Sequence, residues 1–153
     1  MKMQGNLVDY SRAPKILGQR ILSPDIPKEE AKIFVTNIER DTLTNPYYRR
    51  VLFTTDTMQL VVMKLFPGQN IPMETHEGTQ FVRIEEGRAL VQIENKRFYL
   101  LPDQIIMIPP RVQHYFENAG QGPLSLYSIY SPPEHAADKL QYDQEYILRS
   151  MRL

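Results

Sequence analysis

The sequence predicts an all-β fold, a sandwich or a barrel, from two observations. Short apolar or β-branched segments recur at nearly regular spacing, and turn residues separate them. In addition, 12 prolines interrupt the 153 residues, which favours many turns over long helices. The expected strands cover residues 50–54, 59–66, 80–85, 89–94, 97–101, 105–108, 113–117 and 124–130.

The two ends of the chain differ from this β-rich centre. We expect an extended N-terminal arm over residues 1–27, a β-barrel over 28–135 and a C-terminal helix over 136–153 that packs on the barrel. The helix prediction rests on the helix-forming residues of 134–149. The segment 33–38 could add an edge strand.

The composition excludes several classes of partner and site. Lys+Arg and Asp+Glu both number 18, without a basic block, which argues against a nucleic acid or an anionic membrane as partner. The chain has no cysteine, so any metal must be held by nitrogen and oxygen atoms. The segment 1–15 lacks the apolar core of a signal peptide, and no apolar run reaches membrane-spanning length. We therefore expect a cytoplasmic protein.

Two of the chain's three histidines lie in segments that could form one site. In a continuous strand, residues two apart point to the same face, so Glu74 and His76 could both point into the barrel. Gln80 begins the next expected strand and could point into the same space. His114 follows the turn at Pro109–Pro110, which holds it in place.

Each of these residues has a plainer interpretation when taken alone. Glu74 could be a solvated loop carboxylate, and His114 could be a core histidine that hydrogen-bonds a neighbour. His135 follows two prolines and is typical of a surface residue at the start of a helix. The spacing of the two segments together favours a shared site instead.

That spacing resembles the paired motifs of the cupin superfamily over roughly residues 50 to 135. In the first motif, five residues follow Gly68, and then come Glu74-Thr75-His76, three residues, Gln80, six residues and Gly87. In the second, five residues follow Asp103, and then come Pro109-Pro110-Arg111, two residues, His114, three residues and Asn118.

The resemblance implies a double-stranded β-helix, or jelly-roll, barrel with the metal ligands Glu74, His76, Gln80 and His114. Glu74 stands where the motif has a histidine, and Gln80 stands where it has a glutamate. This variation is similar to a subgroup of small single-domain cupins, some of which are described as resembling mannose-6-phosphate isomerase.

Asp103 and Arg111 replace two turn glycines of the motif. Their presence suggests turns that avoid a positive φ, or that tolerate it in Asp.

These four side chains suit a divalent transition metal, namely Fe, Mn, Ni, Co or Zn. Two histidines and one carboxylate are also the ligand types of non-haem iron sites. Two alternatives stay open. Gln80 could hydrogen-bond a bound water instead of the metal, and Glu74 could act as a catalytic base.

Met63, Val82, Ile84 and Phe116 are the candidates to line a substrate pocket, and they predict a mostly apolar one. Such a pocket favours a compact organic substrate over a sugar phosphate, because phosphate needs convergent basic groups. The leading hypothesis is therefore a small-molecule enzyme, a metal-dependent oxygenase.

Two alternative functions remain. A sugar or sugar-phosphate isomerase would gain support if Arg88, Arg97 or Arg111 lay at the rim of the cavity. A non-catalytic cupin that binds a small molecule or serves a structural role is suggested by the substitutions at 74 and 80.

The strand pattern also predicts a homodimer, which the resemblance implies too. With Gln80 facing inward, Phe81 and either Val112 or Tyr115 fall on an outer face. Exposed apolar strand faces commonly bind a partner. The alternative is that the C-terminal helix covers this face within one chain.

Overall fold

The computed structural model describes residues 33–144, and all structural statements below refer to this range. It contains ten strands and one helix. They are α2 (Ile38–Thr44), β1 (Arg49–Thr54), β2 (Gln59–Leu65), β3 (Asn70–Glu74), β4 (Thr79–Glu86), β5 (Ala89–Ile93), β6 (Lys96–Leu100), β7 (Ile105–Ile108), β8 (His114–Asn118), β9 (Leu124–Ser131) and β10 (Leu140–Gln141).

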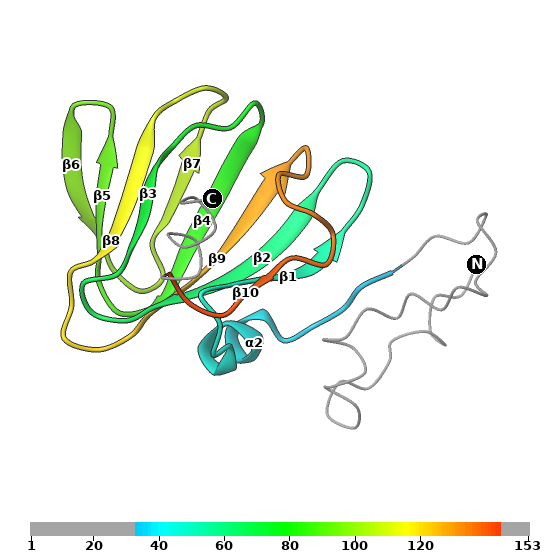
Figure 1. The fold of residues 1–153 in the computed structure, drawn as a ribbon, viewed down its shortest axis with the longest axis horizontal. Helices are drawn as coiled ribbons and strands as arrows, with labels where there is room; N and C mark the ends of the chain where they lie inside the picture. Colours follow the sequence, from blue (N-terminus) through cyan, green and yellow to red (C-terminus); the bar gives the residue numbers. More distant parts are fainter. Residues whose placement is uncertain (1–32, 145–153) are drawn as a thin grey trace, which may run out of the picture.

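The strands form two antiparallel sheets (Figure 1). The six-stranded sheet has the order β10-β1-β2-β9-β4-β7, and the four-stranded sheet has the order β3-β8-β5-β6. All eight strands expected from the sequence are confirmed, each within one residue at either end. The prediction of an all-β fold is thus confirmed, while β3 and β10 are strands that were not among those expected.

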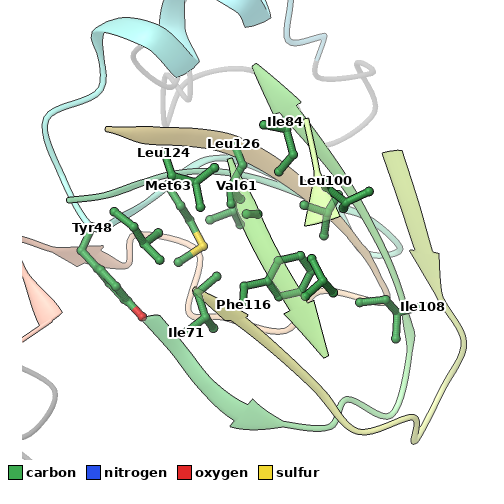
Figure 2. Packing of buried hydrophobic residues seen from close by; sticks show 14 of the residues in the cluster. Tyr48, Val61, Met63, Ile71, Ile84, Leu100, Ile108, Phe116, Leu124 and Leu126 are labelled. Atoms are coloured by element: carbon green, nitrogen blue, oxygen red, sulfur yellow. The ribbon is translucent and has the colours of Figure 1, made fainter. Parts of the chain in front are cut away.

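The core lies between the two sheets because alternate side chains of the central strands point inward. In β4, Val82 and Ile84 are buried opposite Ser128 and Leu126 of β9. Figure 2 shows Met63, Ile84 and Phe116 within one cluster of buried side chains. The four predicted pocket residues, Met63, Val82, Ile84 and Phe116, are all at most 1% exposed.

The possible edge strand over 33–38 does not form, and helix α2 follows this segment at Ile38–Thr44. Residues 33–37 form no strand, and the helix begins after Asn37, whose side chain accepts a hydrogen bond from the Arg40 N–H. Acidic Glu39 and Asp41 in the first turn favour the helix through its dipole. The helix packs on the outer face of the six-stranded sheet, where Lys64 Nζ donates to the Leu43 carbonyl.

The expected C-terminal helix does not begin at residue 136, because residues 136–143 are not helical and the first helical residue is Gln144. Residues 134–139 form a bend and a turn, and Leu140–Gln141 forms β10, which pairs with β1. Two interactions hold this segment against the barrel: Gln59 accepts the His135 N–H, and Gln141 accepts a hydrogen bond from Arg49. Residues 145–153 and the expected arm at 1–27 lie outside the described residues.

Both non-glycine turn residues of the motifs adopt the left-handed conformation, with φ of 69° at Asp103 and 61° at Arg111. The alternative in which these turns avoid a positive φ is therefore wrong. Arg111 uses this conformation to donate its backbone N–H to the His76 carbonyl.

In the described part of the chain, no helix is long and apolar enough to cross a membrane.

Candidate functional site

Three predicted ligands meet at the junction of β3 and β8. Glu74 ends β3 opposite His114, the first residue of β8. Glu74 Oε1 lies 3.3 Å from His76 Nε2 and 3.7 Å from His114 Nε2. The three potential ligand atoms lie within 4.8 Å of one another. This cluster can hold a metal ion.

The route by which His76 reaches the site differs from the expectation of a continuous strand. The pairing of β3 with β8 shifts register between Ile71 and Glu74, and β3 ends at Glu74. His76 therefore lies in the loop after the strand, where Arg111 donates a backbone hydrogen bond to its carbonyl. The strand bulge and this contact bring the imidazole back toward Glu74.

Both imidazoles present Nε2 to Glu74 because their Nδ1 atoms face other groups. His114 Nδ1 lies 2.9 Å from the Val112 carbonyl. His76 Nδ1 lies 3.0 Å from Glu134 Oε1. Neither Nε2 atom has an aligned hydrogen bond, nor does His76 Nδ1, although all three atoms are buried. Buried nitrogens that face one carboxylate without satisfied hydrogen bonds fit a divalent cation well.

Gln80 is 2% exposed, and its amide presents a free oxygen. Its Nε2 donates to Ser128 Oγ and to the Tyr130 hydroxyl, both at 3.1 Å. Its Oε1 is buried and has no hydrogen-bond partner. The Tyr130 ring in turn packs edge-on against His76 with centroids 5.3 Å apart. The amide is thus oriented so that oxygen, the atom able to ligate, is the unpartnered one.

The charges of the site stabilise Glu74 as a carboxylate. Burial alone would raise its pKa, but interactions with His114 and His76 and the charge of Arg49 lower it well below the usual range. Burial would lower the pKa of His76, but Glu74 and Glu134 raise it instead. A metal ion must therefore compete with a proton for His76.

His135 is half-buried and packs against the barrel, contrary to its expected place on the surface. Its ring packs edge-on against Tyr130 at 5.1 Å, and Gln59 binds both its N–H and its carbonyl. Burial, followed by the charge of Arg49, lowers the pKa of His135 to about 3. It is therefore neutral at physiological pH.

Four residues at or beside the site were not predicted from the sequence. Tyr130 and Ser128 hold the Gln80 amide, Glu134 contacts His76, and Arg49 influences the pKa of Glu74. Tyr130 could have been found by strand alternation, because it falls on the inward parity of its expected strand. Glu134 and Arg49 reach the site through long-range contacts that no local pattern records.

Two of the three arginines whose position would favour an isomerase lie elsewhere, whereas Arg111 lies in the turn that contacts the His76 carbonyl. The Arg88 guanidinium stacks 3.8 Å from the Tyr99 ring centroid, and Arg97 donates to Gln92. Both belong to the outer face of the four-stranded sheet. That face also carries a shallow pocket of about 230 Å³, on the side opposite His114, lined by Met73, Leu90, Gln92, Arg97, Tyr115 and Glu117.

Comparison with known proteins gives consistent matches. A family profile for the cupin domain matches residues 61–130. The chain is 39% identical to Bacillus subtilis YrkC over 111 residues, which are 68% of this chain and 60% of YrkC. It is 38% identical to protein L612 of Acanthamoeba polyphaga mimivirus over 109 residues, 68% of each chain. It is also 34% identical to the polyketide synthase CurC of Streptomyces cyaneus over 80 residues, 52% of this chain and 51% of CurC.

Solved structures agree with the fold. The crystal structure of BH2720 from Bacillus halodurans superposes with a TM-score of 0.75 at 34% identity, and the match covers 81% of this chain and 99% of that one. An RmlC-like cupin with a double-stranded β-helix fold from Methanocaldococcus jannaschii gives a TM-score of 0.53 at 18% identity, covering 70% and 87%. The two facing sheets, the motif spacing and these matches together establish that the chain belongs to the cupin superfamily.

Proposed function

We propose that this cupin binds one divalent transition metal ion through Glu74, His76 and His114, with the Gln80 amide oxygen as a fourth ligand. The observation that supports this most is the pair of buried Nε2 atoms that face one carboxylate without aligned hydrogen bonds. Leaving a buried polar atom unsatisfied costs about 1–3 kcal/mol. A bound cation would remove that cost at both nitrogens and at Gln80 Oε1.

The donor set supports Fe, Mn, Ni, Co or Zn, since imidazole nitrogen and carboxylate oxygen suit all of these ions. Two histidines and one carboxylate with open positions are typical of non-haem iron oxygenases, in which the metal activates dioxygen. We therefore propose a metal-dependent oxygenase as the leading activity. Glu74 would serve as a ligand rather than as a base, because its lowered pKa makes it a poor proton acceptor.

The residues around the metal ligands would control access and proton supply. Burial raises the pKa of Tyr130, so its hydroxyl stays protonated and would be able to donate a hydrogen bond to a substrate in the site. The predicted pocket residues Met63, Val82, Ile84 and Phe116 lie in the apolar core, where they would exclude water. An apolar interior favours a compact organic substrate, and the similarity to a polyketide synthase is consistent with that class.

Metal analysis of tag-free protein, followed by an oxygen-uptake screen, tests this function. Elemental analysis should find close to one equivalent of metal, and His76→Ala and His114→Ala should each lose it. Protein loaded anaerobically with Fe(II) should then consume oxygen in the presence of an organic substrate. One equivalent of metal without turnover under any metal or substrate would count against the oxygenase.

The non-catalytic alternative makes a different prediction in the same experiment. It is motivated by the acid at 74 and the amide at 80 in place of the usual motif residues. The non-catalytic alternative would be favoured if the protein contained less than about a tenth of an equivalent of metal and if His76→Ala did not change that content.

We also propose that the protein is a homodimer. Phe81 and Tyr127 stack on the outer face of the six-stranded sheet, beside Ile105 and Met107, which are 50% and 62% exposed. Tyr115 is on the outer face of the other sheet, whereas Val112 packs against the core and takes no part in such a surface. Light scattering tests the proposal, and a monomer at micromolar concentration would overturn it.

A further inference from the structure

We propose that Arg49 binds an anionic oxygen group of the substrate, a carboxylate or a phosphate, beside the metal ligands. This inference rests on the proposed function, because it names the class of molecule that the same site would accept. It was not evident from the sequence, in which the arginines considered for this role were Arg88, Arg97 and Arg111.

Arg49 is a buried cation that faces the interior of the barrel. It pairs with Met63 in the β1–β2 register, and directly opposed residues of antiparallel strands share a face, so both side chains point toward the core. The residue is only 6% exposed. Its Nη1 donates to Gln141 Oε1 at 2.8 Å, but its Nε has no hydrogen-bond partner.

No carboxylate of the described residues forms an ion pair with Arg49. Glu74, the acid at the metal site, has its contacts with His76 and His114, and Glu134 has its contact with His76. A buried guanidinium to which residues 33–144 give no ion pair carries a large desolvation cost. An anion bound beside it would offset this cost, and the planar guanidinium suits carboxylate and phosphate oxygens.

The guanidinium lies on the side of the barrel where the metal ligands are. Its charge contributes to the lowered pKa of Glu74 and to those of His135 and Lys139. Lys139 is half-buried beside β1, since its carbonyl accepts the Val51 N–H. Arg49 and Lys139 thus lie near the carboxylates of Glu74 and Glu134, and a divalent metal ion bound by Glu74 would make this group of charges net positive, which favours an anion.

A purely structural role for Arg49 is the competing explanation, because its bond to Gln141 joins β10 to β1. That bond uses one of the five N–H groups of the guanidinium. The guanidinium also lies 5.7 Å from the Tyr48 ring centroid, but its buried Nε–H has no partner, and a bound anion would supply one.

The test measures binding of propionate and of its uncharged isostere propionamide by ligand-observed NMR, with inorganic phosphate as a separate arm. Each is measured on Zn²⁺-loaded protein and on chelator-treated protein. We expect propionate or phosphate to bind and propionamide to bind at least about tenfold more weakly, because hydrogen bonds to a charged group are strong. Whichever of propionate and phosphate binds more tightly identifies the anionic group that Arg49 prefers.

Variants separate Arg49 from its surroundings. Arg49→Gln should weaken anion binding about tenfold or more, and Arg49→Lys should weaken it less because it keeps the charge. Arg50→Gln is the matched control, since its neighbouring position in β1 points to the other face. Gln141→Leu removes the link to β10 and should preserve anion binding. Thermal unfolding verifies that each variant is folded.

Equal binding of propionate and propionamide with no binding of phosphate would overturn the proposal, as would an Arg49→Gln variant with wild-type anion affinity. A failure of the proposed function looks different. In that case the protein binds no metal, while chelator-treated protein still binds the anion in a manner that depends on Arg49.

Discussion

Glu134 Oε1 lies 3.0 Å from His76 Nδ1, on the side of the imidazole opposite Glu74. A carboxylate at this position favours the tautomer with the hydrogen on Nδ1 and leaves the Nε2 lone pair available for a metal. The Val112 carbonyl does the same for His114. Both histidines therefore direct Nε2 toward Glu74, and the raised pKa of His76 means that a metal ion must compete there with a proton.

Removing the Glu134 carboxylate should weaken metal binding. We expect Glu134→Ala to reduce Zn²⁺ affinity by about 10-fold to 100-fold, the usual effect of losing a group that orients a metal-bound histidine. Glu134→Gln should have a smaller effect, because an amide oxygen can still accept the Nδ1 hydrogen. Competition with a chromophoric chelator measures these affinities.

The control for this experiment is Glu77→Gln, which removes one exposed negative charge near the same loop. It should leave the affinity unchanged within a factor of about two, because exposed charges are screened by salt. If Glu77→Gln and Glu134→Ala weakened binding equally, general electrostatics and not orientation of His76 would be the cause.

The amide at position 80 offers a second change at the metal ligands. Replacing it by the glutamate that the motif usually carries should raise the affinity for Zn²⁺ by tenfold or more, about 1.4 kcal/mol, because a carboxylate is a stronger donor than an amide. Gln80→Leu should lower the affinity. The same chelator competition measures both variants.

Ser128→Ala is the control here, since it removes one hydrogen-bond partner of Gln80 Nε2 without changing Oε1. Affinities that stay the same in both Gln80→Glu and Gln80→Leu would show that the side chain does not ligate the ion.

His135 should make the metal-free protein sensitive to acid. Burial, followed by the charge of Arg49, lowers its pKa in the folded state to about 3, whereas it is about 6.5 in an unfolded chain. Protonation therefore favours unfolding: the contribution of neutral His135 is fully present above pH of about 6.5 and is lost as the pH falls toward 3. The slope is at most about 1.4 kcal/mol per pH unit.

Urea unfolding of chelator-treated protein at several pH values measures this slope. In His135→Gln, the slope of the free energy of unfolding against pH, between pH of about 6.5 and 4, should decrease by at most the amount that corresponds to the uptake of one proton. His76 acts in the opposite direction, because its raised pKa adds stability at low pH that is lost as the pH rises through that value. Since both proteins contain His76, an identical slope in the two would contradict the assignment to His135.

Local sequence patterns predicted the central strands and most of the candidate metal ligands, because these features depend on residues close together in the chain. Strand alternation and turn residues gave the eight strands, and motif spacing identified the three residues that meet as Glu74, His76 and His114. The parity argument placed His76 on a continuous strand, yet the bulge in β3 and the loop contact with Arg111 bring it to the site instead.

The features that escaped prediction depend on contacts between distant parts of the chain. Residues 134–143 have helix-forming composition, but Gln59 and Arg49 hold this segment from 76 and 92 residues away. Tertiary hydrogen bonds thus outweigh a helix propensity of a few tenths of a kcal/mol per residue. Helix α2 was not predicted for a different reason. It has only 7 residues, and its N-cap Asn37 is a weak local signal.

Gly87, which closes the first motif, should not tolerate even the smallest side chain. Its φ is +90°, and a Cβ atom there would lie 2.4 Å from the Pro123 carbonyl oxygen, a contact that the backbone must move to relieve. We expect Gly87→Ala to lower the free energy of unfolding by about 2 kcal/mol or more. Gly122→Ala is the matched control, since nothing lies within 4 Å of its Cβ position. Urea unfolding measures both, and equal stabilities for the two variants would contradict the close approach of the two turns.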